Sequence, residues 1–161
     1  MTRSLVAVAA ALFAVAVHAA PKDGEQFDDW KTACETPSEG ATVCHVFQRI
    51  TMKESGKQLL HVAVGYPKPD EPPVVVFTLP LGIALPPGVM FKVEDGEGVR
   101  APFTVCTPDG CRAGLKLTDE LVTAMQKGMK ATLAFASIEA KGYNVPVSLK
   151  GFSKALASLK P

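Results

Sequence analysis

Short apolar runs alternate with clusters of glycine and proline along most of the chain. The runs are rich in β-branched and aromatic residues, and a turn cluster follows each after about ten residues, which is typical of an all-β domain. We therefore predict a mainly antiparallel all-β fold, either a β-sandwich or a partly closed barrel of about eight or nine short strands. The expected strands are 28–35, 41–50, 58–66, 73–79, 88–94, 99–106, 111–117, 130–138 and 145–151.

Two of these runs indicate how the strands face their surroundings. In 111–117, apolar residues occupy every second position, which predicts one buried and one exposed face. The run 74–77 is apolar at every position, so we expect it in the middle of a sheet. Pro72 and Pro73 suit the start of that strand, where no ladder hydrogen bond is needed.

Two segments depart from the strand pattern and predict one or two short helices beside the sheets. In 118–128, Thr118 suits the N-cap, acidic residues follow in the first turn, and Gly128 suits the helix end. In 152–160, bulky apolar residues recur at helical spacing, which predicts a second amphipathic helix.

The beginning of the chain has a different character. Arg3 precedes an uncharged apolar run, and the residues just before Ala20 fit the small-x-small pattern of a signal peptidase site. The apolar run is short for a bilayer and no stop-transfer charges follow, so we predict a cleaved signal peptide at 1–19 rather than a membrane anchor. Residues 20–161 then form a single exported domain that is periplasmic, associated with the outer membrane, or secreted.

The charge balance narrows the classes of partner. The chain has 17 basic and 16 acidic residues, and because Arg3 lies in the predicted signal peptide, the exported domain is formally neutral. The sequence has neither the basic stripe that a nucleic-acid surface requires nor a polybasic patch for anionic membranes. Later apolar runs are interrupted well below spanning length, so we expect no nucleic-acid partner and no transmembrane segment in the exported domain.

The four cysteines are Cys34, Cys44, Cys106 and Cys111. An exported protein meets an oxidising compartment, so we predict two disulfides, for which three connectivities are open. Pairing of the sequence neighbours is favoured because each pair brackets turn residues. Their spacings fit the short knuckles of a zinc site poorly.

The second cysteine pair raises a question of register. The four residues TPDG between Cys106 and Cys111 favour a tight turn that brings the two cysteines opposite each other. Counted with a period of two, however, Cys106 lies opposite the apolar face of its own strand, whereas Cys111 belongs to the apolar face of the next. We therefore predict a β-bulge near Pro102 or Gly110 that resets the register.

Side chains suited to catalysis are few. His45 and His61 both fall in predicted strands between apolar neighbours, and neither has further ligands at metal-binding spacing. The sequence has no nucleophile elbow, phosphate-binding glycine loop or calcium loop, and the acidic run 94–98 is typical of a hairpin turn. We predict no catalytic, cofactor-binding or metal-binding residues, and no cofactor.

Three aromatic residues are candidates for a surface that binds a ligand: Trp30, Tyr66 and Tyr143. Aromatic side chains combine a large apolar area with a polar tip, which suits them to partly wet binding surfaces. For Trp30 a core position at the edge of the first strand is favoured over a ligand surface.

Several motifs occur in an order that resembles the invasion-associated locus B family of exported bacterial proteins. They are W-x3-C at 30–34, CHVFQ at 44–48, LPLGIALPPGV at 79–89, CTPDGC at 106–111 and VSLKGFSKAL at 147–156. The resemblance covers about residues 26 to 159. It implies a mostly β fold in the periplasm or at the outer surface, structural disulfides at the four cysteines, no known catalytic residues, and an association with entry into host cells.

We therefore expect a non-catalytic envelope or surface protein that interacts with an envelope or host protein, in host-cell invasion or envelope maintenance. The alternatives are a periplasmic ligand- or glycan-binding module and, less favoured, a small hydrolase that uses His45 or His61. An interaction protein predicts a large exposed apolar patch. A glycan module requires exposed aromatics on one concave face, and a hydrolase requires a histidine in a cleft beside a carboxylate or hydroxyl.

Overall fold

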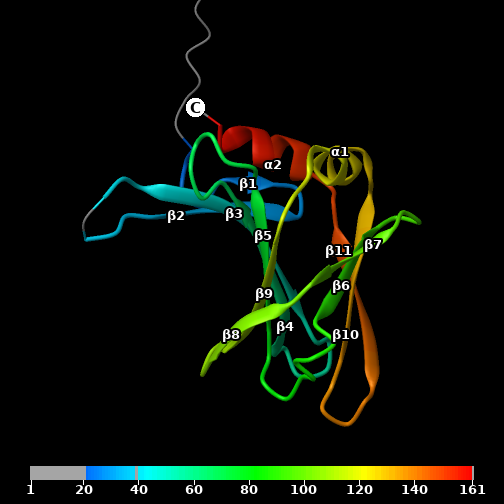
Figure 1. The fold of residues 1–161 in the computed structure, drawn as a ribbon. Helices are drawn as coiled ribbons and strands as arrows, with labels where there is room; N and C mark the ends of the chain where they lie inside the picture. Colours follow the sequence, from blue (N-terminus) through cyan, green and yellow to red (C-terminus); the bar gives the residue numbers. More distant parts are fainter. Residues whose placement is uncertain (1–20, 39, 161) are drawn as a thin grey trace, which may run out of the picture.

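Residues 21–38 and 40–160 are described by the computed structural model, and the predicted signal peptide lies outside them. Eleven strands and two helices make up this part of the chain (Figure 1). They are β1 (Gln26–Phe27), β2 (Trp30–Glu35), β3 (Val43–Thr51), β4 (Gln58–Gly65), β5 (Val74–Leu79), β6 (Val89–Val93), β7 (Gly98–Ala101), β8 (Phe103–Thr107), β9 (Gly110–Lys116), α1 (Asp119–Lys127), β10 (Lys130–Ala136), β11 (Gly142–Ser148) and α2 (Phe152–Ser158).

The strands form two antiparallel sheets. The larger has seven strands in the order β1-β2-β3-β4-β5-β9-β8, and the smaller has four in the order β11-β10-β6-β7. Their inner faces pack on each other, with Phe77 of β5 and Phe91 of β6 placing their ring centroids 5.1 Å apart. Of the two architectures that the sequence predicts, the structure is therefore the β-sandwich.

Alternation along the strands matches their place in the sandwich. β5 lies inside the larger sheet between β4 and β9, as its continuously apolar sequence predicts. In β9, Cys111 and Ala113 point into the core while Arg112 is exposed. The core thus collects every second residue of each inner strand, and the other parity forms the outer face of the sheet.

The predicted strand 99–106 is wrong as a single strand. It divides at Pro102 into β7, which ends the smaller sheet, and β8, which ends the larger one. Proline has no N–H to donate to a ladder, so pairing cannot run through this position and the chain crosses between sheets there. This division and the very short β1 raise the strand number above the expected eight or nine.

Both predicted helices form, side by side at one end of the sandwich (Figure 1). The Thr118 hydroxyl caps α1 by accepting a hydrogen bond from the Leu121 N–H at 3.3 Å, and Met125 buries the apolar face of the helix. Phe152 and Leu156 do the same for α2. Neither helix is long and apolar enough to cross a membrane, and no other helix occurs in 21–38 or 40–160.

Beneath α2, buried polar side chains join the two sheets. The Trp30 indole N–H donates to the Ser148 carbonyl at 2.9 Å, and the Trp30 ring packs on Phe152 with centroids 5.0 Å apart. The Gln48 amide N–H donates to the Asp29 carbonyl at 3.1 Å, and its oxygen accepts from the Ser148 N–H at 3.0 Å. Residues from three of the sequence motifs therefore meet in one structural junction between β2, β3, β11 and α2.

Candidate functional site

The four cysteines form two cross-strand disulfides. Cys34 of β2 is bonded to Cys44 of β3, and Cys106 of β8 is bonded to Cys111 of β9. Within the β8–β9 hairpin the register shifts between Phe103 and Val105, close to Pro102 and not at Gly110. This irregularity brings the two cysteines opposite each other, as the period-two pattern requires, and both bonds brace hairpins of the larger sheet.

The three candidate aromatic residues do not form one surface. Trp30 is fully buried, as the core position favoured from the sequence requires: its indole fills the core junction under α2. Tyr66 follows β4 at the helical end, with the Lys160 ammonium 5.7 Å from its ring centroid. Tyr143 lies near the start of β11 and stacks on Phe135 with centroids 5.3 Å apart. Both tyrosines are half-buried and lie toward opposite ends of the sandwich.

His45 and His61 lie on the outer face of the larger sheet, on either side of Phe47. Their ring centroids are 6.1 and 5.3 Å from that of Phe47. Burial of the His61 ring lowers its pKa from 6.5 to about 4, and the neighbouring Arg49 and Arg112 charges act in the same direction. The surroundings of His61 are therefore an aromatic ring and cations, rather than the carboxylate that would orient a hydrolytic histidine.

The low pKa of His61 predicts that stability depends on pH. The unfolded chain binds a proton at His61 near pH 6.5 and the folded protein only near pH 4, so between these values the unfolded state carries more protons. The free energy of unfolding should therefore fall as the pH drops from 7 to 5. After discounting for the partial exposure of the ring, we expect a loss of about 1 kcal/mol, measurable by urea unfolding at both pH values.

The variant His61→Gln provides the control for this pH effect because its side chain is polar and does not titrate. In this variant, we expect the difference in the free energy of unfolding between pH 7 and pH 5 to be about 1 kcal/mol smaller than in the wild type. The pKa values of Glu94 and Glu120 are held below 4.5 by backbone hydrogen bonds, so these carboxyls titrate below the tested range. Equal pH dependence in the two proteins would contradict the prediction.

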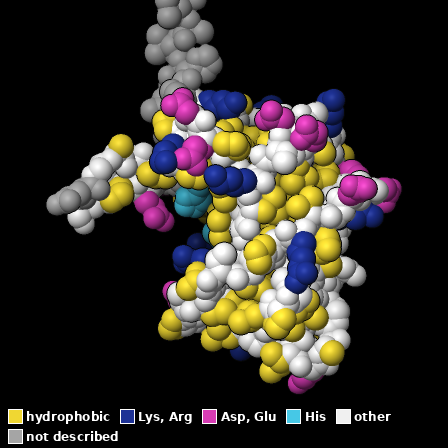
Figure 2. All heavy atoms as spheres, in the orientation of Figure 1, with side chains coloured by type: hydrophobic (Ala, Val, Ile, Leu, Met, Phe, Trp, Pro, Cys, Tyr) yellow, Lys and Arg dark blue, Asp and Glu magenta, His cyan; other side chains and the backbone are white. Residues whose placement is uncertain are grey.

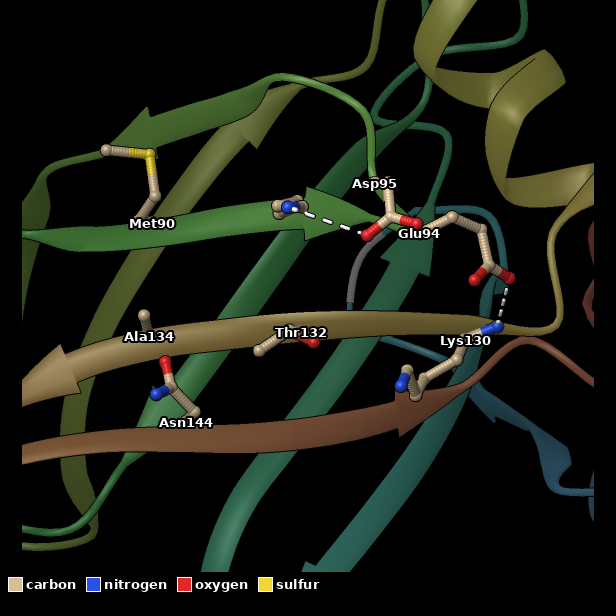
Figure 3. Close-up of a pocket in the computed structure, with 8 residues that line it drawn as sticks. Met90, Glu94, Asp95, Lys130, Thr132, Ala134 and Asn144 are labelled. Atoms are coloured by element: carbon tan, nitrogen blue, oxygen red, sulfur yellow. Dashed lines mark hydrogen bonds and ion pairs between the residues drawn. The ribbon is translucent and has the colours of Figure 1, made fainter.

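A shallow depression of about 370 Å³ lies on the outer face of the smaller sheet (Figure 3). The Glu94 carboxylate at one end accepts hydrogen bonds from the N–H groups of Met129 and Lys130 at 2.6 and 2.9 Å. Lys92 approaches Asp95 at 4.0 Å. The hydrogen bonds of Glu94 tie the β6–β7 turn to the start of β10. Within 21–38 and 40–160, no three or more His, Cys, Asp or Glu residues gather to hold a metal ion.

The end of the sandwich opposite the helices is built from two loops that bind each other. Loop 80–88 carries most of the motif LPLGIALPPGV, and loop 137–141 joins β10 to β11. The Ala84 N–H donates to the Ala136 carbonyl at 2.8 Å, and the Ile138 N–H donates to the Gly82 carbonyl at 3.1 Å. Buried Ile83 anchors the first loop in the core, so the two loops form one fixed surface.

Three large aliphatic side chains on these loops remain in solvent, and together we call them the apolar end. Leu81 is 59% exposed, Leu85 44% and Ile138 74%. Figure 2 shows hydrophobic side chains gathered over this lower end of the molecule, where Figure 1 places the two loops. A monomer gains nothing from exposing such side chains together, so this patch is the candidate interaction site.

Only part of the apolar end can be predicted from the sequence. The motif at 79–89 stands out, but its glycines and prolines predict only a loop. The sequence predicts a strand that ends at Ile138, whereas this residue lies in the loop that pairs with Gly82. Nothing local in the sequence indicates that loops 80–88 and 137–141, which are distant along the chain, form one surface.

The fold and its surfaces define a small disulfide-linked β-sandwich protein with an exposed aliphatic patch at one end. Residues 30–160 match the sequence model of the invasion associated locus B (IalB) protein family. The chain belongs to this family, and the resemblance that its motifs carry is confirmed.

Individual relatives agree with this assignment. The chain is 28% identical over 138 residues to the invasion protein B homologue of Brucella abortus strain 2308, which covers 82% of this chain and 76% of that protein. The homologue of strain 9-941 of the same species gives the same values. The crystal structure of invasion associated protein B from Bartonella henselae superimposes with a TM-score of 0.73 at 26% identity, covering 84% of this chain and 92% of that one.

Proposed function

We propose that the protein is exported after removal of residues 1–19 and that residues 20–161 act as one domain in the bacterial envelope or at the cell surface. The two disulfides support this location because such bonds persist in oxidising compartments. Membership of the IalB family supports it as well, since the relatives are named for invasion.

The protein acts without catalysis, by binding an envelope or host protein through the apolar end. The observation that carries this proposal is the exposure of Leu81, Leu85 and Ile138 on two loops that backbone hydrogen bonds hold together. A preformed apolar surface loses little conformational entropy when a partner covers it, so burial of these side chains translates efficiently into affinity. Bulky residues at the centre of such a patch supply most of the binding energy.

The double variant Leu81→Gln/Ile138→Gln tests the proposal in a strain deleted for this gene. Both side chains are exposed, so we expect the variant to fold and accumulate like the wild type while the partner loses its apolar contact. Complementation should then leave host-cell entry or detergent resistance, whichever the deletion impairs, at the level of the deleted strain. Entry assays and detergent sensitivity measured in parallel distinguish invasion from envelope maintenance.

A matched control is Val43→Gln/Met129→Gln, which removes two exposed apolar side chains away from the apolar end. It should restore the phenotype fully at equal protein level. Full complementation by Leu81→Gln/Ile138→Gln would exclude the apolar end as the interaction site. A deletion that changes only detergent resistance would remove host invasion from the proposed function.

A further inference from the structure

The outer face of the larger sheet carries a second surface that the apolar end does not include. Cross-strand register places Arg49 of β3, His61 of β4, Thr78 of β5 and Arg112 of β9 in one row. Strands in a sheet are about 4.8 Å apart, so the backbones of the two arginines are separated by roughly 14 Å along this row. This row, which we call the cationic track, carries an arginine at each end, with the neutral side chains of His61 and Thr78 between them.

A second row runs beside the first and consists of apolar side chains, all of them short except Phe47. It consists of Phe47, Ala63, Val76 and Gly114, again opposite one another in register. Phe47 stands above the short side chains of this row and faces His61 with an interplanar angle of 34°. The result is a row of small side chains that ends in an aromatic ring on β3, with the cationic track along one side.

The two arginines on this face have no carboxylate partner among the described residues. Arg49 and Arg112 form no ion pair with any residue in the described part of the chain, while the Arg49 guanidinium lies 5.3 Å from the Phe47 ring centroid. Both guanidinium groups are exposed and retain donors for a planar anion. Figure 2 shows the histidine side chains beneath the projecting β2–β3 hairpin, with basic side chains close by.

We propose that this face binds an acidic polysaccharide. Carboxylate groups of the polymer engage Arg49 and Arg112, and a sugar ring beside Arg49 lies on Phe47 of the same strand, with its C–H groups against the aromatic ring. An extended polymer suits a flat track that crosses four strands, whereas a lipid surface would require the bulky aliphatic side chains found instead at the apolar end. The site includes none of the candidate aromatics Trp30, Tyr66 and Tyr143, because its aromatic residue is Phe47.

Binding of the purified exported domain to polygalacturonate at about 50 mM salt tests the proposal, with neutral dextran, polyglutamate and phosphatidylglycerol vesicles as comparison probes. We expect polygalacturonate to bind and dextran not to bind. The variant Arg49→Gln/Arg112→Gln should weaken binding at least tenfold. Phe47→Leu should weaken it severalfold, because the stacking plane is lost while the charges remain.

Lys127→Gln/Lys154→Gln is the matched control because it removes two exposed positive charges from the helices. It should change the affinity less than twofold. An equal loss in this control would mean that net charge alone drives binding and would overturn the proposal. Three other results would also overturn the proposal: absence of polygalacturonate binding, equally tight binding of polyglutamate, or binding of the vesicles alone. Equally tight binding of polyglutamate would indicate an acidic peptide partner.

Discussion

Replacement of Trp30 by alanine is expected to lower the free energy of unfolding by about 4 kcal/mol. The indole is fully buried and packs on Phe152, so its removal leaves a cavity beneath α2 that the two rigid sheets cannot close. Urea unfolding of the purified domain, followed by circular dichroism, measures the change. A loss below about 1 kcal/mol would show that the junction does not depend on this ring.

Two further variants separate packing from hydrogen bonding at the same position. Trp30→Phe keeps an aromatic ring but removes the N–H that donates to the Ser148 carbonyl. The Gln48 amide also donates to that carbonyl, at 3.3 Å, so the acceptor keeps a partner and the loss should stay near 2 kcal/mol. Lys31→Ala, on the exposed side of the same strand, should change the free energy by less than about 0.5 kcal/mol.

The sequence predicts the strands well where alternation and turn residues agree. The β9 alternation, the central place of β5 and the Thr118 cap of α1 are all confirmed. The partition into two sheets is less accessible, because a period of two identifies the buried face of a strand but not the sheet it joins. Pro102 was the local signal for the crossover from β7 to β8, and its missing N–H should have divided the predicted strand.

Function was harder to predict because both candidate surfaces are assembled from distant segments. The track from Arg49 to Arg112 exists only through the register of four strands, so a formally neutral composition concealed a local excess of positive charge. Trp30 is a candidate for a binding surface only by residue type, and its burial agrees with the core position that the sequence favours. Local sequence thus identified chemically suitable side chains, whereas only the fold shows which of them share a surface.

The family motifs divide physically into two groups. Trp30, Gln48 and Gly151 belong to the junction that joins the sheets under the helices, where substitutions are expected to affect stability. The motif at 79–89 instead presents Leu81 and Leu85 to solvent at the opposite end of the sandwich. Because the two groups are separated in space, variants at the apolar end test binding without disturbing the junction.

Gly151→Ala is expected to destabilise the fold by about 3 kcal/mol, although it adds only one methyl group. Gly151 begins α2 with φ at 84°, a conformation that costs L-residues energy. A Cβ atom there would also collide with the carbonyl group of Phe27 and lie 2.9 Å from the Asp28 Cβ. Both contacts are with the chain beside β1, so α2 or β1 must shift to relieve them.

Gly142→Ala is the matched control for this effect, since a Cβ atom at Gly142 meets nothing within 4 Å. We expect this variant to remain within about 0.5 kcal/mol of the wild type, because the substitution adds a methyl group at an exposed strand end. Urea unfolding of both variants at pH 7 measures the difference. Similar stability of Gly151→Ala and Gly142→Ala would mean that α2 moves away from β1 at little cost, and that the end of the sandwich beneath the helices is not rigid.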